Sequence, residues 1–102
     1  MNAINWKNAC VSDLRRLNII KILLKNHVKL LTYLFDKRAP RLNASSEELK
    51  NNGFSQGEKV LIELALDIWS NEGGSKVMEI THGLDYQNFK RSLHVLTLLR
   101  SL

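Results

Sequence analysis

The side chains that could perform catalysis are few in this sequence, and their spacing does not assemble a reactive group. Cys10 and His27 could serve as a nucleophile and its base, but they lie seventeen residues apart and no third residue orients the histidine. Glu63 and Asp67 share one helical face, where they form a simple i, i+4 charge ladder with Lys59. One cysteine and three scattered histidines do not match a metal-ligand pattern. The sequence therefore predicts a protein that is not an enzyme and that uses neither a metal nor a cofactor.

A second group of polar side chains has the chemistry of nucleic-acid contacts. Arginine can make bidentate hydrogen bonds to guanine, asparagine or glutamine to adenine, and lysine reaches phosphate. Lys21, Lys25 and Lys29 form a stripe on one face of the expected helix, where lysines four residues apart repel one another and so need either solvent or an anionic partner. The candidate nucleic-acid contacts are Lys21, Lys25, Lys29, Gln87, Asn88, Lys90, Arg91 and His94. A solvated helix surface would explain the same residues without a ligand.

The charge of the chain is uneven along its length. The net charge is +5, with ten Lys or Arg and four acids in residues 1–50, and five Lys or Arg and six acids in residues 51–102. A basic surface attracts any polyanion, including nucleic acid, an anionic membrane surface or an acidic protein. The charge alone does not choose among these partners.

Helices must position these residues, because apolar residues recur at spacings of three and four along most of the chain. Residues 12–37 contain neither Gly nor Pro and are expected to form one long basic helix at the centre of the fold. A connector with a short helix is expected over residues 38–54, and a helical half over residues 55–102. No segment alternates with period two for long enough to predict a strand. We therefore expect one all-α domain over residues 1–102, a compact bundle of about five helices.

The C-terminal half contains the clearest helix signals. Ser55 and Glu58 have the spacing of a capping box at the start of a helix that is apolar nearly all round. Asp85 is placed to cap the last helix. The expected apolar side of that helix is Tyr86, Phe89, Leu93, Leu96 and Leu99, and the expected apolar side of the short helix before it is Val77, Met78 and Ile80.

The order of a short helix, a turn at Gly83 and a longer helix is similar to a helix-turn-helix DNA-binding unit. The resemblance is one of pattern, and it implies that the last helix enters the major groove. Two positions depart from the usual pattern: Glu79 stands where a small residue is usual, and His82 where an apolar one is usual.

The apolar residues exceed what five helices of this size can easily bury, and surplus apolar surface often marks an interface. The candidates for a protein interface are Trp6, Ile19 and Ile22. We expect a small regulatory module that binds a protein partner or a second copy of itself, with DNA binding by the last helix as the alternative. The sequence has neither a membrane span nor a secretory signal, so we expect a cytoplasmic location.

Overall fold

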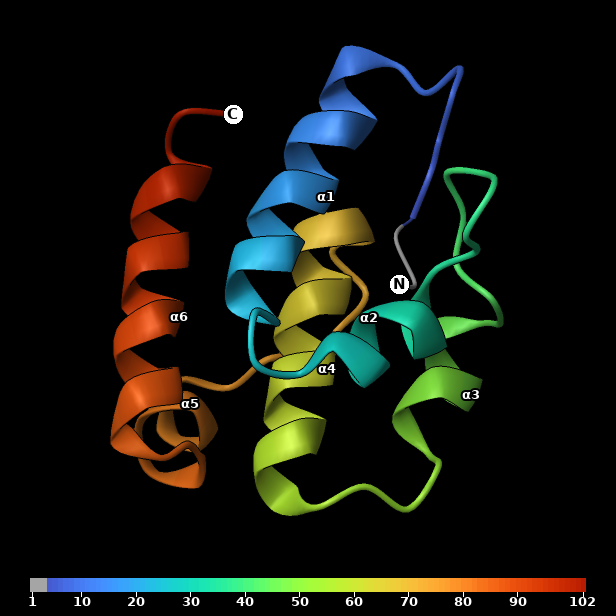
Figure 1. Cartoon of the computed structure of the whole chain (residues 1–102). Coiled ribbons are helices and arrows are strands. Elements are labelled where there is room, and N and C mark those ends of the chain that lie inside the picture. Colours follow the sequence, from blue (N-terminus) through green and yellow to red (C-terminus); the bar gives the residue numbers. More distant parts are fainter. Residues whose placement is uncertain (1–3) are drawn as a thin grey trace.

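The computed structural model describes residues 4–102 as a bundle of short and medium helices (Figure 1). The helices are α1 (Val11–Leu23), α2 (Val28–Leu34), α3 (Ser46–Lys50), α4 (Gln56–Ser70), α5 (Val77–Gly83) and α6 (Tyr86–Leu99). The all-α prediction is confirmed: residues 4–102 contain no strand, and only an isolated bridge joins Phe35 to Leu42. No helix in this part of the chain is long and apolar enough to cross a membrane.

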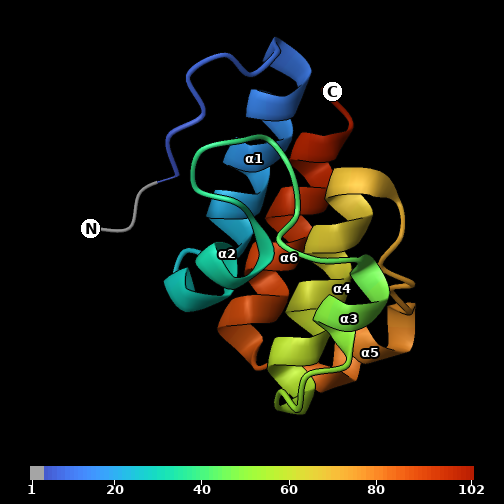
Figure 2. The same cartoon turned by 90° about the vertical axis from the view of Figure 1, so that its right-hand side faces the viewer.

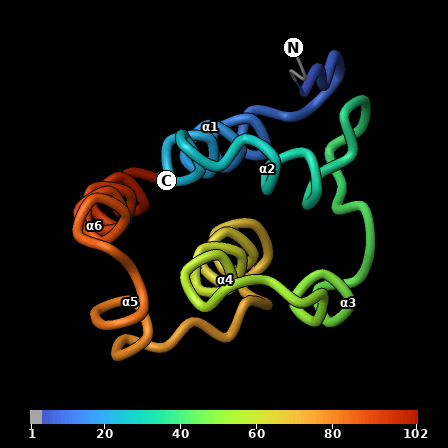
Figure 3. Tube along the Cα trace, turned by 60° about the horizontal axis from the view of Figure 1, so that its bottom comes forward, coloured from blue at the N-terminus to red at the C-terminus, as the bar shows by residue number. Residues whose placement is uncertain are grey.

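Helix α4 lies at the centre of the bundle, with the other helices around it (Figure 3). The predicted capping box is present: the Ser55 side chain accepts a hydrogen bond from the Glu58 N–H, and the Glu58 side chain accepts one from the Ser55 N–H. Seven of the fifteen residues of α4 are buried, as its nearly continuous apolar sequence predicted. The central helix is therefore α4, and the prediction that the basic N-terminal segment would occupy the centre is wrong.

The single long helix expected over residues 12–37 is also wrong, because the chain breaks after Leu23. In the break, the N–H of Lys25 donates to the Ile22 carbonyl and the N–H of His27 donates to the Leu24 carbonyl. These bonds span three residues instead of four and end the α-helical ladder.

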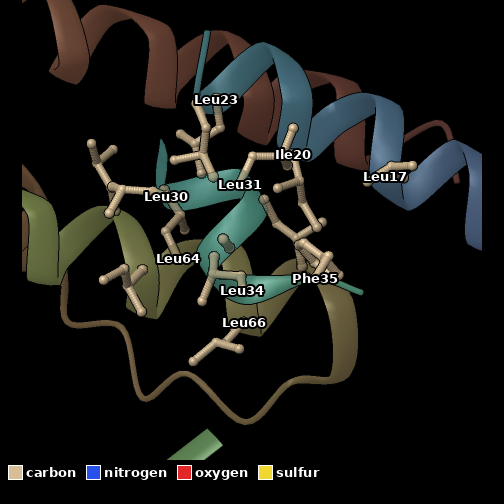
Figure 4. Close-up of a cluster of buried hydrophobic side chains, with 14 of the residues drawn as sticks. Leu17, Ile20, Leu23, Leu30, Leu31, Leu34, Phe35, Leu64 and Leu66 are labelled. Carbon is tan, nitrogen blue, oxygen red and sulfur yellow. The ribbon is translucent and has the colours of Figure 1, made fainter. Parts of the chain in front are cut away.

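The break has a packing reason. After it, α2 turns toward α4, so that its apolar residues pack against α1 and α4 in one cluster (Figure 4). A straight helix would carry this second set of leucines past the end of the core. The cluster joins Leu17, Ile20 and Leu23 of α1, Leu30, Leu31 and Leu34 of α2, the adjoining Phe35, and Leu64 and Leu66 of α4.

Two of the three residues predicted for a protein interface lie in the core. Trp6 is 6% exposed, and its ring centroid lies 5.8 Å from that of Phe35 and 5.5 Å from that of Trp69. Ile19 is 7% exposed and belongs to the same core. The N-terminal segment folds back over the bundle, and α1 buries a wider arc than its sequence suggested. Neither residue is therefore available to a partner, whereas Ile22 is exposed.

Helix α6 lies beside α1 and runs antiparallel to it (Figure 1). Its buried residues are Ser92 and Val95. The Ser92 hydroxyl donates to the Asn88 carbonyl in the preceding turn, so this small polar residue is buried without an unsatisfied group. The predicted apolar side of α6 is consequently wrong in part, since Tyr86, Leu93 and Leu96 are exposed.

Helix α5 has no buried residue, although Ile80 packs against the core. Val77 and Met78 were predicted to face the interior, yet they are 76% and 64% exposed. Helix α5 has only seven residues, so it covers too little of α4 to bury Val77 and Met78 as well as Ile80. These two side chains therefore add apolar surface to the molecule.

Candidate nucleic-acid interface

A groove of about 560 Å³ lies between the end of α1 and the first half of α6. We call it the α1–α6 groove. Five of the eight predicted nucleic-acid contacts line it together, although one of them lies about sixty residues from the others along the chain. The lining residues are Ile22, Lys25, Tyr86, Gln87, Lys90, Arg91 and His94.

Local signals in the sequence place these side chains. The Asp85 carboxylate accepts a hydrogen bond from the Asn88 N–H, which fixes the start of α6 one residue later. The groove residues of α6 then lie at positions i, i+1, i+4, i+5 and i+8, a spacing that puts them on one side of the helix. They are Tyr86, Gln87, Lys90, Arg91 and His94. The end of α1 at Leu23 puts Lys25 in a turn opposite that side.

The groove is lined by cations without any acidic side chain. Within residues 4–102, the ion pairs are Arg16 with Asp13 and Arg41 with Asp36, and both lie outside the groove. The Lys90 Nζ lies 5.2 Å from the centroid of the Tyr86 ring, which is a cation–π distance. The positive charge of the groove is therefore left for an anionic ligand.

Arg91 contributes a buried donor that lacks a partner. Its Nη1 atom is buried and makes no hydrogen bond within the described part of the chain. Buried polar atoms are nearly always paired, because an unsatisfied donor costs about 1–3 kcal/mol. A phosphate oxygen or a base edge in the groove would supply the missing acceptor.

Three predicted contacts lie elsewhere. Lys29 lines a separate hollow beside His27 and Glu58. Lys21 is exposed on α1, and Asn88 is half-buried on the side of α6 that carries the buried Ser92. The predicted stripe of three lysines on one helix face is thus wrong, because the break after Leu23 separates its members.

Two further residues line the groove. Ile22 was predicted for a protein interface, and Tyr86 was predicted both for the apolar side of the last helix and among the residues that this helix would offer to the major groove. Tyr86 is 72% exposed because it lies in the first turn of α6, where no other helix covers it. The adjacent cap residue Asp85 marks the start of the helix, and it is the signal that could have placed Tyr86 at an exposed end.

The helix-turn-helix pattern holds in order but not in detail. Only Leu84 and Asp85 connect α5 to α6, whereas the turn of a helix-turn-helix unit has about three to four residues. In addition, α1 is the helix that packs most extensively along α6, and α5 is largely exposed. The first turns of α6 extend past the end of α1 (Figure 1).

Basic and acidic residues are concentrated in different segments of the chain. Residues 1–44 carry nine Lys or Arg and two acids, and residues 45–84 carry three Lys or Arg and seven acids. Residues 85–102 carry three Lys or Arg and one acid. Figure 2 shows the N-terminal segment, α1 and α2 on one side, and α3, α4 and α5 on the other. The α1–α6 groove therefore belongs to the basic part of the molecule.

The fold and the groove define a small all-α protein with a basic surface between two antiparallel helices. No family model, no curated protein and no solved structure matches this chain. Among residues 4–102, no group of three or more His, Cys, Asp or Glu side chains could hold a metal ion.

Proposed function

We propose that this protein is a small, non-enzymatic, cytoplasmic DNA-binding protein that holds the duplex at the α1–α6 groove. The observation that carries the proposal is the convergence of Lys25, from the turn after α1, with Gln87, Lys90, Arg91 and His94 of α6 in a groove without acidic side chains. Five of the eight candidate contacts line this one groove.

The side chains divide into two roles. Lys25 and Lys90 are suited to phosphate contacts, which give sequence-independent affinity. Arg91 and Gln87 are suited to base edges, since both can make bidentate hydrogen bonds in the major groove. The major groove is about 12 Å wide and admits a helix, and the first turns of α6, where Tyr86, Gln87 and Lys90 are exposed, are the part that would enter it.

The first prediction concerns the salt dependence of binding. Lys25→Ala should weaken binding to a labelled random-sequence duplex and lower the slope of log K against log salt by about 0.9, the value for one lost phosphate contact. Fluorescence anisotropy between low and moderate salt measures both quantities. Lys59→Ala is the matched control, because Lys59 is exposed near the start of α4 and lies outside the groove. Equal effects of the two substitutions, or no duplex binding by the wild type at low salt, would reject the proposal.

A second candidate function, self-association, is supported by the exposed apolar residues of α5. Val77 and Met78 stand between residues of opposite charge, Lys76 and Glu79. In a two-fold symmetric dimer every contact occurs twice: if one residue of the first copy contacts another residue of the second, the same two residues also meet with the copies exchanged. Lys76 of one copy would then face Glu79 of the other, with the apolar pair between them. A second copy of this chain is therefore the partner that fits this surface.

The test of self-association is the molecular mass in solution. We expect a dimer by sedimentation at micromolar concentration, and Met78→Glu should convert it to a monomer because it puts a charge in the apolar contact. Val11→Glu is the control, since Val11 is equally exposed but lies at the start of α1. A wild-type monomer at every concentration would exclude this second function and leave DNA binding unaffected.

A further inference from the structure

A second basic groove, of about 620 Å³, lies away from α6. It is formed where the N-terminal segment runs beside the turn that follows α2. We call it the N-terminal groove. Like the α1–α6 groove, it has no acidic side chain in its lining. The lining residues are Asn5, Lys7, Asn8, Lys37, Arg38, Ala39 and Pro40.

The N-terminal wall of this groove is held in place by the fold. The N–H of Asn5 donates to the Lys37 carbonyl at 2.8 Å, which ties the segment to the turn. Trp6 is buried beside it, and its Nε1 donates to the Asp36 carbonyl at 2.8 Å. The exposed residues on either side of Trp6 therefore have fixed backbone positions.

The opposite wall is held by the Asp36 carboxylate. Its Oδ1 accepts from the N–H of Arg38 at 2.8 Å and from the N–H of Ala39 at 3.2 Å. Its Oδ2 forms an ion pair with Arg41 at 3.1 Å. The N–H of Arg38 lowers the pKa of the Asp36 carboxyl more than desolvation raises it, and Arg41 lowers it further. The nearest acid is thus already paired and does not neutralise the groove.

The cations of the N-terminal groove have no partners of their own. Within residues 4–102, the side chains of Lys7, Lys37 and Arg38 make neither a hydrogen bond nor an ion pair. Three like charges on fixed backbone repel one another, and an anion between them would remove that repulsion. The side-chain amides of Asn5 and Asn8 add neutral donors. Cations combined with amide donors are the groups that proteins use for phosphate oxygens.

The two grooves lie on opposite flanks of α1. Helix α6 is on one side of α1, and the N-terminal segment with the turn after α2 is on the other (Figures 1 and 3). Arg15 and Lys21 are exposed on α1, and Arg15 lines a small hollow beside the end of α6. The longest dimension of the molecule is 38 Å, which corresponds to about eleven base pairs at roughly 3.4 Å each.

We propose that the N-terminal groove is a second phosphate-binding site, which contacts the backbone of the same DNA that the α1–α6 groove holds. This inference rests on the proposed function, and it adds a footprint that extends across α1. We expect the N-terminal groove to contribute affinity through phosphate contacts, because it gathers the three cations Lys7, Lys37 and Arg38.

The test compares two lengths of DNA. The double variant Lys37→Ala/Arg38→Ala keeps the backbone hydrogen bonds of the turn and removes two cations. On a duplex of about 20 base pairs, it should lower the salt slope by about 1.8, or 0.9 for each lost phosphate contact. On a hairpin duplex of about 6 base pairs held by Lys25 and α6, it should leave the slope unchanged. The control Lys59→Ala/Arg100→Ala makes the same charge change outside both grooves and should leave both slopes unchanged.

Three outcomes have distinct meanings. The second site is supported if the salt slope falls only for Lys37→Ala/Arg38→Ala and only on the long duplex. If that variant binds both duplexes like the wild type while Lys25→Ala weakens both, the second site is wrong and the proposed function stands. If the wild type binds neither duplex, both are overturned. Circular dichroism of the variants identifies any loss of folding, and Lys37→Gln/Arg38→Gln then repeats the comparison with longer side chains.

Discussion

Gly73→Ala should destabilise the fold by about 3 kcal/mol, one of the two largest effects expected in this protein. Gly73 is buried against α4, and a Cβ added there would overlap the main-chain carbonyl of Glu63 and come within 2.8 Å of the Asp67 carboxyl carbon. The carbonyl belongs to the backbone of the central helix and cannot rotate away as a side chain could. The connection between α4 and α5 would therefore have to move. Urea unfolding followed by circular dichroism measures the loss.

The Asp67 carboxylate explains why this connection cannot shift cheaply. It accepts hydrogen bonds from the N–H groups of Gly73 at 2.7 Å, Gly74 at 3.2 Å and Ser75 at 2.8 Å. Burial raises the pKa of the Asp67 carboxyl, but the hydrogen bonds from Ser75, Gly73 and Gly74 outweigh burial and leave this pKa below its ordinary value. Moving Gly73 away from Glu63 would break charge-assisted bonds as well as packing.

Gly57→Ala is the matched control for Gly73→Ala. Gly57 lies in the first turn of α4, where an added Cβ would meet only the Gly83 carbonyl at 3.5 Å, an ordinary contact distance. Alanine loses less backbone entropy than glycine in a helix, so this variant should be more stable by about 0.5 kcal/mol. If Gly73→Ala were as stable as Gly57→Ala, the close approach of the α4–α5 connection to α4 would be wrong.

The elements of this fold that could be predicted from the sequence have a local cause. The capping box of Ser55 and Glu58 and the cap of Asp85 each use atoms within three residues of one another. The burial of α4 follows from apolar residues on nearly every side of it. These features do not depend on where other helices lie, so the helix starts and the all-α class could be read directly.

The elements that could not be predicted depend on contacts distant in the sequence. Residues 12–37 have helical periodicity throughout, but Leu30 and Leu34 reach α4 only if the chain breaks after Leu23. Hydrophobicity assigned Leu93 and Leu96 of α6 to the interior, yet the residues of α6 that the fold buries are Ser92 and Val95. A side chain that satisfies its own hydroxyl within the helix is as easy to bury as an apolar one, and hydrophobic periodicity does not detect it.

In the candidate site too, the part that could be predicted depends on local sequence, and the part that was missed depends on distant contacts. The α6 contacts Gln87, Lys90, Arg91 and His94 share one helix side, so a correct helix start keeps them together. The lysine stripe required residues 21–29 to be one straight helix, and only Lys25 remains in the groove once that helix breaks. The N-terminal groove was missed altogether, because it pairs segments about thirty residues apart that no pattern connects.

Trp6→Ala should cost about 3–5 kcal/mol of folding free energy, the range for truncating a buried aromatic side chain. Trp6 packs against both Phe35 and Trp69, and these two rings also contact each other with centroids 5.1 Å apart. The indole N–H bonds the Asp36 carbonyl, so truncation leaves that acceptor unpaired as well as a cavity. Urea unfolding of the variant measures the loss.

Two comparisons separate burial of Trp6 from a role in binding a partner. Trp6→Phe keeps much of the ring packing and loses the hydrogen bond, so it should cost about 1–2 kcal/mol. Tyr86→Ala removes an aromatic ring that is 72% exposed and should change stability by less than about 0.5 kcal/mol. If Trp6→Ala were as stable as Tyr86→Ala, Trp6 would be exposed in solution and again a candidate for a protein interface. The N-terminal groove would then lose the anchor that fixes Asn5 and Lys7 beside Arg38, and its phosphate site with it.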